Sequence, residues 1–401
     1  MKKLIICLII LFTVPHVIAL ECGEILDHPV NLTQDLDGCG EAGLVFITGG
    51  SLQCNGHAIQ GVDAGASVAI RVIGNDVSIQ NCEVAGFKLG ILAQGSHDLF
   101  VDQFSMEGGE AGIFLNKAVQ GSLQHLNLQD MKDGIYLFQS QDITIEDAQI
   151  KASEHGLNLE GSSTIGVSAL TSDSAFIGVS SEDSTNVIMD ELTLVDNRFC
   201  IRSTDDIDLT VGTSDISHCS IGVQVRRSTG TVIDANHIHA NDRGISVESA
   251  DSTFIQHNLI EQNNNFGIEL SGEPTLTLID NNTLVQSGNA NLLLGKSDLT
   301  VVSENTIKDS PYGVFSQRSS RQILMNNVIT NHRNGIWLDV DGRIIIMNNF
   351  FLGNQEDIGG RKAIGLVFNN YILSAIPIGK SPESLLFFLN TFSERLTTLL
   401  A

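Results

Sequence analysis

The sequence predicts an all-β fold: a single-stranded, right-handed parallel β-helix of about 14 coils with a period of about 22 residues. A glycine followed by alternating apolar residues recurs at nearly constant spacing, as in the segments that begin at Gly112, Gly134 and Gly156. Apolar residues within each repeat recur at every second position, which is typical of strands and not of helices. Strands this short cannot bury a face alone, so successive repeats must stack and share a core.

The repeat extends over nearly the whole chain. Cys200 takes the glycine position once, one-residue expansions follow Gly244, and the shorter spacing resumes later. The series of marks is too regular for chance: Gly90, Gly112, Gly134, Gly156, Gly178, Cys200, Gly222, Gly244, Gly267, Ala290, Gly313, Gly335 and Asp357.

Asparagines fall at one position of several repeats, each just before an apolar residue that is expected to point inward. Stacked asparagines can hydrogen-bond to the coils on either side. We therefore expect an internal ladder formed by Asn236, Asn258, Asn282, Asn305, Asn327 and Asn349.

The cysteines indicate an oxidising compartment. Six remain when Cys7 in the N-terminal apolar segment is set aside, and no Cys-x-x-Cys or Cys/His metal spacing occurs. We expect bridges that close the first turn or link stacked coils, between Cys22 and Cys39, Cys54 and Cys82, and Cys200 and Cys219.

Four regions are expected: a signal peptide at 1–19, an N-terminal cap with the first coils at 20–66, the β-helix at 67–378, and a C-terminal cap at 379–401. Two lysines and a short apolar run ending in small residues indicate secretion. In the last region, Ser381 and Pro382 precede apolar residues at helical spacing, which predicts an amphipathic capping helix that begins there. A helix that binds a membrane or partner is the alternative. We expect a monomer that is secreted, periplasmic or on the cell surface, without a transmembrane span after signal removal.

The charge balance limits the partners. The chain has 47 acidic and 22 basic residues, a formal net charge of −25. Such a surface repels nucleic acid and anionic membranes and favours cations. Solubility alone is the simpler explanation of this charge.

The segments "LQCNGHAIQG" and "VSIQNCEVAGFKLGI" resemble the start of right-handed parallel β-helix repeat proteins of the pectin-lyase-like superfamily. That group includes NosD-type proteins of copper maturation and carbohydrate-binding or sugar-hydrolysing repeats. The resemblance extends from about Cys22 to Tyr371 and implies the fold more strongly than a function, because the superfamily contains lyases, hydrolases, epimerases and non-catalytic proteins. The Asp-Pro-His-Asp stretch of alginate epimerases and the pectate-lyase pattern are missing. Asp205-Asp206 resembles only one element of the pectin-hydrolase pattern.

One column of side chains is expected to face outward, two residues after each mark. Exposed aromatic rings suit sugar rings, which present apolar C–H faces. Rings that stack on one another or lie under a loop are the alternative. The predicted polysaccharide-binding residues in this column are Phe114, Tyr136, Arg202, Phe315 and Trp337, and the column also includes Leu292.

Charged residues gather on the middle coils. Neighbouring carboxylates raise a pKa or recruit a cation such as calcium, and arginine can hold a uronate carboxylate. The candidate catalytic residues are Glu182, Asp183, Asp205, Asp206 and Arg227. Salt bridges between coils at a solvated turn are the alternative.

His237 and His239 form a His-x-His pair with His218 and His257 on neighbouring coils. A copper or zinc site is conceivable there, although the sequence identifies no carboxylate or cysteine that completes it.

Three functions remain open from the sequence. The first is an exported β-helix that binds polysaccharide or a cell-surface glycan along the outward column. The second is a polysaccharide lyase or glycoside hydrolase acting at the acidic cluster, and the third is a structural or adhesive surface protein. The absence of a complete catalytic motif favours binding.

Overall fold

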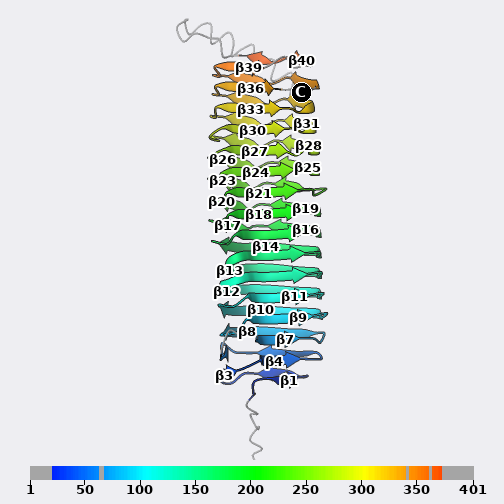
Figure 1. Ribbon diagram of the computed structural model, residues 1–401, viewed down its shortest axis with the longest axis vertical. Helices are drawn as coiled ribbons and strands as arrows, with labels where there is room; N and C mark the ends of the chain where they lie inside the picture. The colour runs from blue at the N-terminus through cyan, green and yellow to red at the C-terminus, as the bar shows by residue number, and fades with distance from the viewer. Residues whose placement is uncertain (1–19, 63–66, 340–342, 361–363, 373–401) are drawn as a thin grey trace, which may run out of the picture. The chain divides into compact units, whose positions relative to one another are not determined.

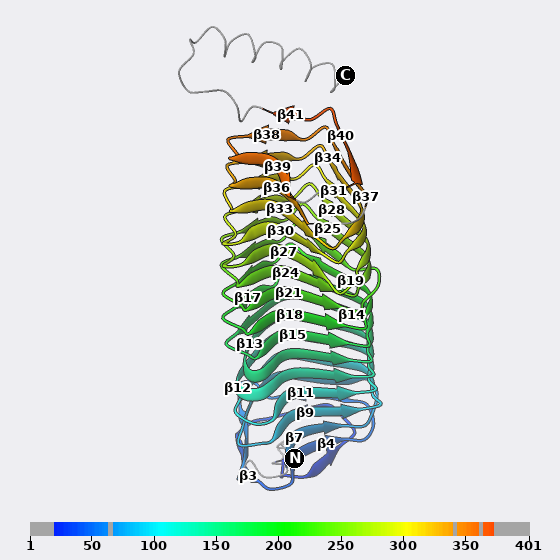
Figure 2. The ribbon, with the colours of Figure 1, turned by 45° about the horizontal axis from the view of Figure 1, so that its top comes forward.

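The structure, a computed structural model, describes residues 20–62, 67–339, 343–360 and 364–372. The chain divides into two compact units, with the division between Ser180 and Ser181. Each unit is a stack of parallel β coils (Figures 1 and 2), and the two contain about 15 turns with a 22-residue period. The predicted all-β parallel architecture is therefore confirmed.

Three parallel sheets form unit 1. The first contains β1 (Glu24–Leu26), β4 (Ala42–Phe46), β7 (Val68–Val72), β9 (Leu89–Gln94) and β11 (Ala111–Asn116). The second begins with β2 (Val30–Asn31) and β5 (Gly50–Gln53), and the third with β3 (Leu36–Cys39) and β6 (Ala58–Gly61). Longer strands run through the corners and join two or three sheets: β8 (Val77–Ala85), β10 (His97–Glu107), β12 (Val119–Phe138), β13 (Gln141–Glu160) and β14 (Ser163–Asp173). The chain then enters β15 (Ile177–Glu182).

Unit 2 also has three sheets, built from shorter strands. The first sheet contains β18 (Phe199–Thr204), β21 (Ile221–Arg226), β24 (Arg243–Glu248), β27 (Phe266–Ser271), β30 (Ala290–Gly295), β33 (Tyr312–Gln317), β36 (Asn334–Asp339) and β39 (Glu356–Gly360). The second contains β16 (Thr185–Asp190), β19 (Ile207–Gly212), β22 (Val232–Asp234), β25 (Asp251–Gln256), β28 (Thr275–Asp280), β31 (Asp298–Ser303), β34 (Ser320–Met325), β37 (Arg343–Met347) and β40 (Ile364–Phe368). The third contains β17 (Thr193–Val195), β20 (Asp215–Ser217), β23 (His237–His239), β26 (Leu259–Glu261), β29 (Thr283–Val285), β32 (Thr306–Lys308), β35 (Val328–Thr330), β38 (Phe350–Leu352) and β41 (Tyr371–Ile372).

Three predicted terminal regions can be compared with the described residues. The N-terminal segment is itself a coil, because β1, β2 and β3 pair with β4, β5 and β6 of the next turn. The predicted region at 20–66 therefore contains a first coil, and its role as a cap of the stack stays a prediction. The predicted signal peptide at 1–19 and the capping helix at 379–401 fall outside the described part of the chain. Within the described ranges all regular elements are strands, and no helix is long and apolar enough to cross a membrane.

The repeated glycine leaves room for the next coil. A Cβ at Gly134 would lie 2.4 Å from the carbonyl oxygen of Gly156 and 2.3 Å from Cγ2 of Ile150. Gly244 meets the carbonyl oxygen of Gly267 in the same way, at 2.5 Å. The close approach of adjacent backbones thus explains why the repeat begins with glycine.

The predicted asparagine ladder is confirmed in unit 2. Each backbone N–H, from Asn236 to Asn327, donates to the side-chain oxygen of the ladder residue one coil later, over 2.8–3.0 Å. Ser214 and Asn370 extend the ladder at its two ends. These bonds satisfy backbone donors that the corners would otherwise bury without partners.

The other two corners carry ladders that the sequence analysis did not identify. Serines occupy one of them, where the N–H of Ser140 donates to Oγ of Ser162 over 3.1 Å. The other uses mixed residues, and here the N–H of His332 donates to Oδ1 of Asn354 over 2.9 Å. His332 is buried, and its ring nitrogens lie 2.9 and 3.1 Å from the carbonyl oxygens of Ser310 and Ile307.

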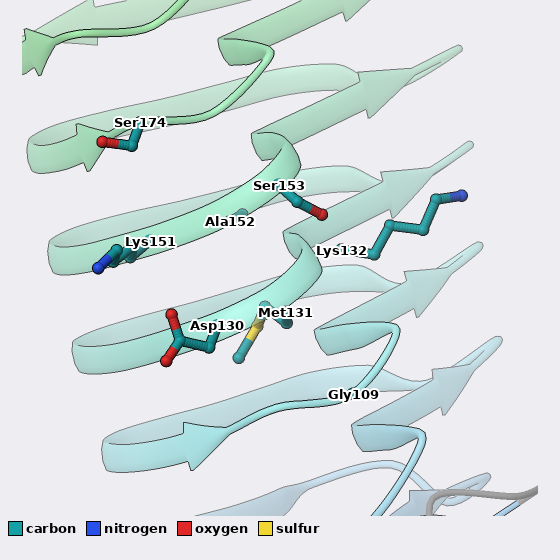
Figure 3. Close-up of a pocket in the computed structure, with 8 residues that line it drawn as sticks. All are labelled: Gly109, Asp130, Met131, Lys132, Lys151, Ala152, Ser153 and Ser174. Carbon is teal, nitrogen blue, oxygen red and sulfur yellow. The ribbon is translucent and has the colours of Figure 1, made fainter.

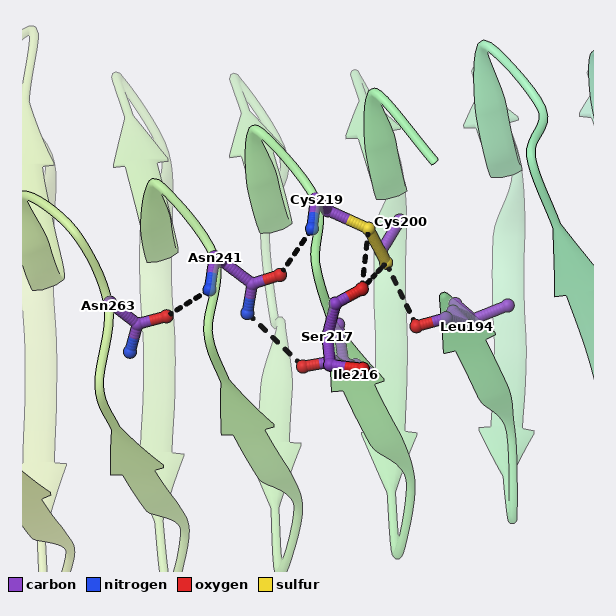
Figure 4. The surroundings of a disulfide bond; sticks show 7 residues. All are labelled: Leu194, Cys200, Ile216, Ser217, Cys219, Asn241 and Asn263. Carbon is purple, nitrogen blue, oxygen red and sulfur yellow. Dashed lines mark hydrogen bonds between the residues drawn. A yellow bond between two sulfur atoms is a disulfide. The ribbon is translucent and has the colours of Figure 1, made fainter. Parts of the chain in front are cut away.

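All three predicted disulfides are present, with Cα–Cα distances of 5.2 Å for Cys22–Cys39, 4.9 Å for Cys54–Cys82 and 5.9 Å for Cys200–Cys219. Figure 4 shows that Cys219 is also a ladder residue, whose N–H donates to Oδ1 of Asn241 over 2.8 Å. The bridge therefore joins the glycine position of one coil to a corner ladder.

We predict that Asn305→Ala lowers the free energy of unfolding by about 2–3 kcal/mol, because it leaves the buried N–H of Asn282 without its acceptor and removes a donor to the carbonyl of Ile279. Urea unfolding of unit 2, followed by circular dichroism, measures this change. Glu304→Gln, at the exposed preceding position, is the matched control and should leave the midpoint unchanged. Equal stability of the two variants would contradict the structural role of the ladder.

His332→Asn should remove a pH dependence of stability. Burial lowers the pKa of His332, whereas in the unfolded chain the imidazole takes up a proton near pH 6.5. Acidification below about pH 6.5 therefore destabilises the wild-type fold, because the unfolded state binds the additional proton. Asparagine already serves at other positions of this ladder: Asn354 one coil later, and Asn241 earlier in the chain.

Urea midpoints at pH 7.5 and pH 5.5 test this prediction. The midpoint of His332→Asn should fall less on acidification than that of the wild type. His97→Asn, at an exposed position, should retain the wild-type slope. An unchanged slope in His332→Asn would overturn the assignment.

Candidate functional site

In each unit, the outer surface of the first sheet carries members of the predicted aromatic column. Phe114, Tyr136, Arg202, Phe315 and Trp337 are all half-buried and alternate with fully buried neighbours. One member of the column was assigned wrongly, because the loop before β30 is longer than assumed. Leu292 pairs with Ile268 and points inward with no exposed surface, and Leu293 is the outward residue.

In unit 1, Phe114 and Tyr136 lie on adjacent strands and stack on each other. Their ring centroids are 4.8 Å apart with an interplanar angle of 8°. The Tyr136 hydroxyl donates a hydrogen bond to the carboxylate of Glu160. The two ring faces therefore pack against each other, which agrees with the alternative that the rings of the column stack on one another.

In unit 2, the rings are arranged differently. Phe315 and Trp337 are register partners on β33 and β36, and Tyr312 stacks on Phe315 with centroids 5.3 Å apart. Tyr312 meets Trp337 edge to face, at 6.3 Å and 66°. The register partner of Trp337 on β39 is Gly359, and the Glu356 side chain occupies the space that a side chain at Gly359 would fill. We call Tyr312, Phe315 and Trp337 the aromatic patch of unit 2.

Polar groups border this patch. Gln317 and Asp339 are register partners at the ends of β33 and β36. The Glu356 carboxylate lies over Gly359, where an added Cβ would be 2.5 Å from it, and accepts a 2.8 Å hydrogen bond from Asn334. The surroundings of Trp337 thus offer hydrogen-bond acceptors beside an apolar ring.

Arg202 lies on the same sheet of unit 2, on β18, apart from the aromatic patch. Its guanidinium carbon is 5.8 Å from the ring centroid of Phe199, and Arg198 approaches the same ring at 5.6 Å. The two arginines therefore flank one phenylalanine in a cation–π arrangement.

The candidate catalytic residues occupy a corner of unit 2. Asp183, Asp205 and Arg227 hold the same left-handed corner position in successive coils, with φ of 51°, 57° and 51°. Arg227 donates two hydrogen bonds to Asp205, over 2.8 and 2.5 Å, and these hold the pKa of Asp205 below its usual range. Glu182 and Asp183 are exposed beside them. The corner thus contains a closed ion pair between coils.

Asp206 is separated from this surface. Its side chain is 1% exposed and occupies a position of the serine ladder. It accepts hydrogen bonds from the N–H of Ser184 over 2.9 Å and from the hydroxyl of Ser203 over 2.6 Å. Burial raises the pKa of Asp206 despite these donors. The adjacent aspartates therefore have opposite environments, one solvated and paired, the other interior.

A shallow hollow of about 450 Å³ lies at a corner of unit 1, where the register of β12 shifts (Figure 3). Lys132 and Lys151 point away from each other on its rims, and Lys132 forms a 3.2 Å ion pair with Glu154. The lining residues are Gly109, Asp130, Met131, Lys132, Lys151, Ala152, Ser153 and Ser174. The sequence analysis did not predict this hollow.

The histidine pair on β23 has a carboxylate partner that the sequence analysis missed. Asp215 on β20 is the register partner of His237, and its Oδ1 lies 3.0 Å from Nε2 of His239. The sequence could have identified this carboxylate, because Asp215 precedes His237 by 22 residues, which is the length of one coil. A second group in unit 1 contains Asp133, Glu154 and His155.

Comparison with known proteins identifies the family. A family profile described as "Periplasmic copper-binding protein (NosD)" matches residues 70–230 and 207–372. No curated protein sequence matches the chain significantly. The profile agrees with the repeat architecture and with the disulfides, which point to an extracytoplasmic protein.

Solved structures share the fold at low sequence identity. The periplasmic alginate epimerase AlgG has 12% identity and a TM-score of 0.52, with 78% of this chain and 79% of that chain covered. A double mutant of the same enzyme gives 13% identity and a TM-score of 0.51 over the same shares. The A-module of the Azotobacter vinelandii mannuronan C-5 epimerase AlgE6 covers 89% of this chain and 91% of its own, at 13% identity and a TM-score of 0.46.

Replacing Asp205 and replacing Asp206 should change the free energy of unfolding in opposite directions. The raised pKa of Asp206 means that the native state loses stability as pH rises above about 4, where this carboxyl ionises in the unfolded chain. Asp206→Asn should therefore gain in urea midpoint over the wild type from pH 4 to pH 7. The lowered pKa of Asp205 has the reverse effect, so Asp205→Asn should be the less stable variant at pH 7. Parallel behaviour of the two variants would contradict the assigned environments.

Proposed function

The chain belongs to the NosD family of β-helix repeat proteins, and we propose that it binds polysaccharide through the aromatic patch of unit 2. The observation that carries this proposal is the position of Trp337. Its indole is half-buried on the outer surface of the first sheet, and its register partner in the next coil is Gly359. An aromatic side chain held in this way offers a firm apolar surface to the C–H groups of a sugar ring.

The neighbours of Trp337 support the same function. Tyr312 packs against both Phe315 and Trp337, which restricts the rings before any ligand arrives. Gln317, Asp339 and Glu356 supply polar groups at the border of the patch, where sugar hydroxyls need partners. An apolar platform edged by acceptors is suited to a carbohydrate.

The charge of the chain indicates the kind of glycan. A formal net charge of −25 repels a polyanion, so a neutral polysaccharide is favoured. An acidic glycan would require a screening cation such as calcium. Phe114 and Tyr136 form a separate candidate contact within unit 1, and Arg202 a secondary contact within unit 2, since part of each of their surfaces is engaged within the protein.

The fold is compatible with a polysaccharide ligand, since AlgG is named for its action on alginate. We do not propose a lyase or hydrolase at the acidic cluster. Asp206 is interior and Asp205 is bound by Arg227, so these two carboxylates do not face a common substrate position.

Trp337 is the only tryptophan in the chain, so its fluorescence reports on the patch directly. We predict that a binding oligosaccharide changes this emission in a saturable titration. Trp337→Ala should weaken binding by at least about tenfold, measured by calorimetry, because a ring contact contributes about 1.4 kcal/mol or more. The panel should contain neutral and acidic polysaccharides, the latter with and without calcium.

Phe254→Ala, which removes an exposed ring from the second sheet of unit 2, is the matched control and should bind normally. Binding that is insensitive to Trp337→Ala would refute the patch as the site. If the protein binds none of the polysaccharides in the panel, a structural role at the cell surface becomes the better explanation.

A further inference from the structure

We infer that the third sheet of unit 2 carries a site for one divalent transition-metal ion of the Zn²⁺ or Cu²⁺ class, with Asp215, His237 and His239 as ligands. The site lies on a different sheet from the aromatic patch and does not depend on the polysaccharide proposal. The family description mentions copper but assigns no residues of this chain. The inference rests on the geometry of three consecutive strands.

Strand alternation brings the ligands to one surface. Ile216, Ile238 and Ile260 are the middle residues of β20, β23 and β26, and all three are fully buried. Asp215, His237 and His239, which flank these residues, therefore point outward and are partly or fully exposed. Register then places Asp215 beside His237.

The donor atoms converge at distances suited to a small ion. Oδ1 of Asp215 lies 3.0 Å from Nε2 of His239 and 3.6 Å from Nδ1 of His237. Ligand atoms bound tetrahedrally at 2.0–2.2 Å from zinc are about 3.3–3.6 Å apart. The two imidazoles are stacked with centroids 4.1 Å apart, so both present their edges to the same carboxylate oxygen. Small side-chain rotations suffice to close the set around an ion.

A second carboxylate orients one ligand. Oε1 of Glu261 lies 3.1 Å from Nε2 of His237, the nitrogen on the side of the ring away from Asp215. This is the carboxylate–histidine–metal relay that fixes the ring and its tautomer in many metal sites. Glu261 is thus a positioning residue. The ligand side chains remain 24–55% exposed, so an ion can enter and water can fill the fourth position.

The donor set selects the metal class. Two imidazole nitrogens with one carboxylate suit Zn²⁺ and Cu²⁺, whereas Ca²⁺ and Mg²⁺ prefer oxygen ligands alone. The Asp133/Glu154/His155 group in unit 1 is a poorer site. It offers a single imidazole, and Lys132 already neutralises Glu154 over 3.2 Å.

The test is calorimetric titration of the metal-stripped, untagged protein with Zn²⁺ and Cu²⁺, because a histidine tag would bind both ions. We expect one equivalent to bind, and Co²⁺ should give the intense visible absorption of a tetrahedral site. His237→Ala and His239→Ala should each abolish this signal and weaken Zn²⁺ binding more than about 100-fold. Glu261→Gln should weaken binding by about 10–100-fold and leave the stoichiometry unchanged.

His155→Ala is the matched control and should bind as the wild type does. Circular dichroism establishes that each variant is folded. The inference fails if the double variant His237→Ala/His239→Ala binds Zn²⁺ normally, if binding is lost in His155→Ala instead, or if the protein binds Ca²⁺ in preference to Zn²⁺.

Discussion

Each corner of a coil buries a backbone N–H that cannot be satisfied within its own turn. The structure meets this requirement with side-chain oxygens from the next coil, as in the bond of 2.8 Å from Asn282 to Asn305. This bond ties adjacent turns together at the spacing that parallel strands need. The inward packing of apolar side chains and the close approach at Gly134 both depend on that spacing. A coil that lost its corner acceptors would lose its alignment with both neighbours.

The period made much of the fold predictable from the sequence. Residues about 22 apart become neighbours, so the asparagine ladder could be inferred from the sequence. The cysteine pairs, which are 17, 28 and 19 residues apart, were inferred instead from their places in the first turn and in stacked coils. The mixed ladder could not be inferred, because asparagine, serine, cysteine and histidine all occupy its positions, so no single residue type marks it. Cys219 and His332, whose N–H groups donate to Asn241 and Asn354, are examples. Alternation failed at Leu292, since a loop of unexpected length shifts the register.

The candidate site was harder to predict for a related reason. Asp205 and Asp206 are adjacent in sequence, yet a left-handed corner residue sends one outward and the next inward. At corners, residues that are adjacent in the sequence therefore do not share a surface. Residues one coil apart do, so these are the pairs from which a functional site can be predicted. Asp215 with His237 and Phe315 with Trp337 are both such pairs. The interior of unit 2 is occupied by packing and ladders, which leaves recognition to the outward columns.

The repetition of asparagine along one corner ladder has a consequence for how the length of unit 2 can change. Because Asn282 donates to Asn305 and Asn305 donates to Asn327 through the same pair of atoms, any asparagine of the series can follow any other. Deleting or duplicating one complete coil would join ladder residues that are already complementary. Unit 2 can thus lengthen or shorten in whole turns, while the exterior of each added turn stays free to acquire its own side chains. Cys200–Cys219 marks the exception, since its two halves must be kept together.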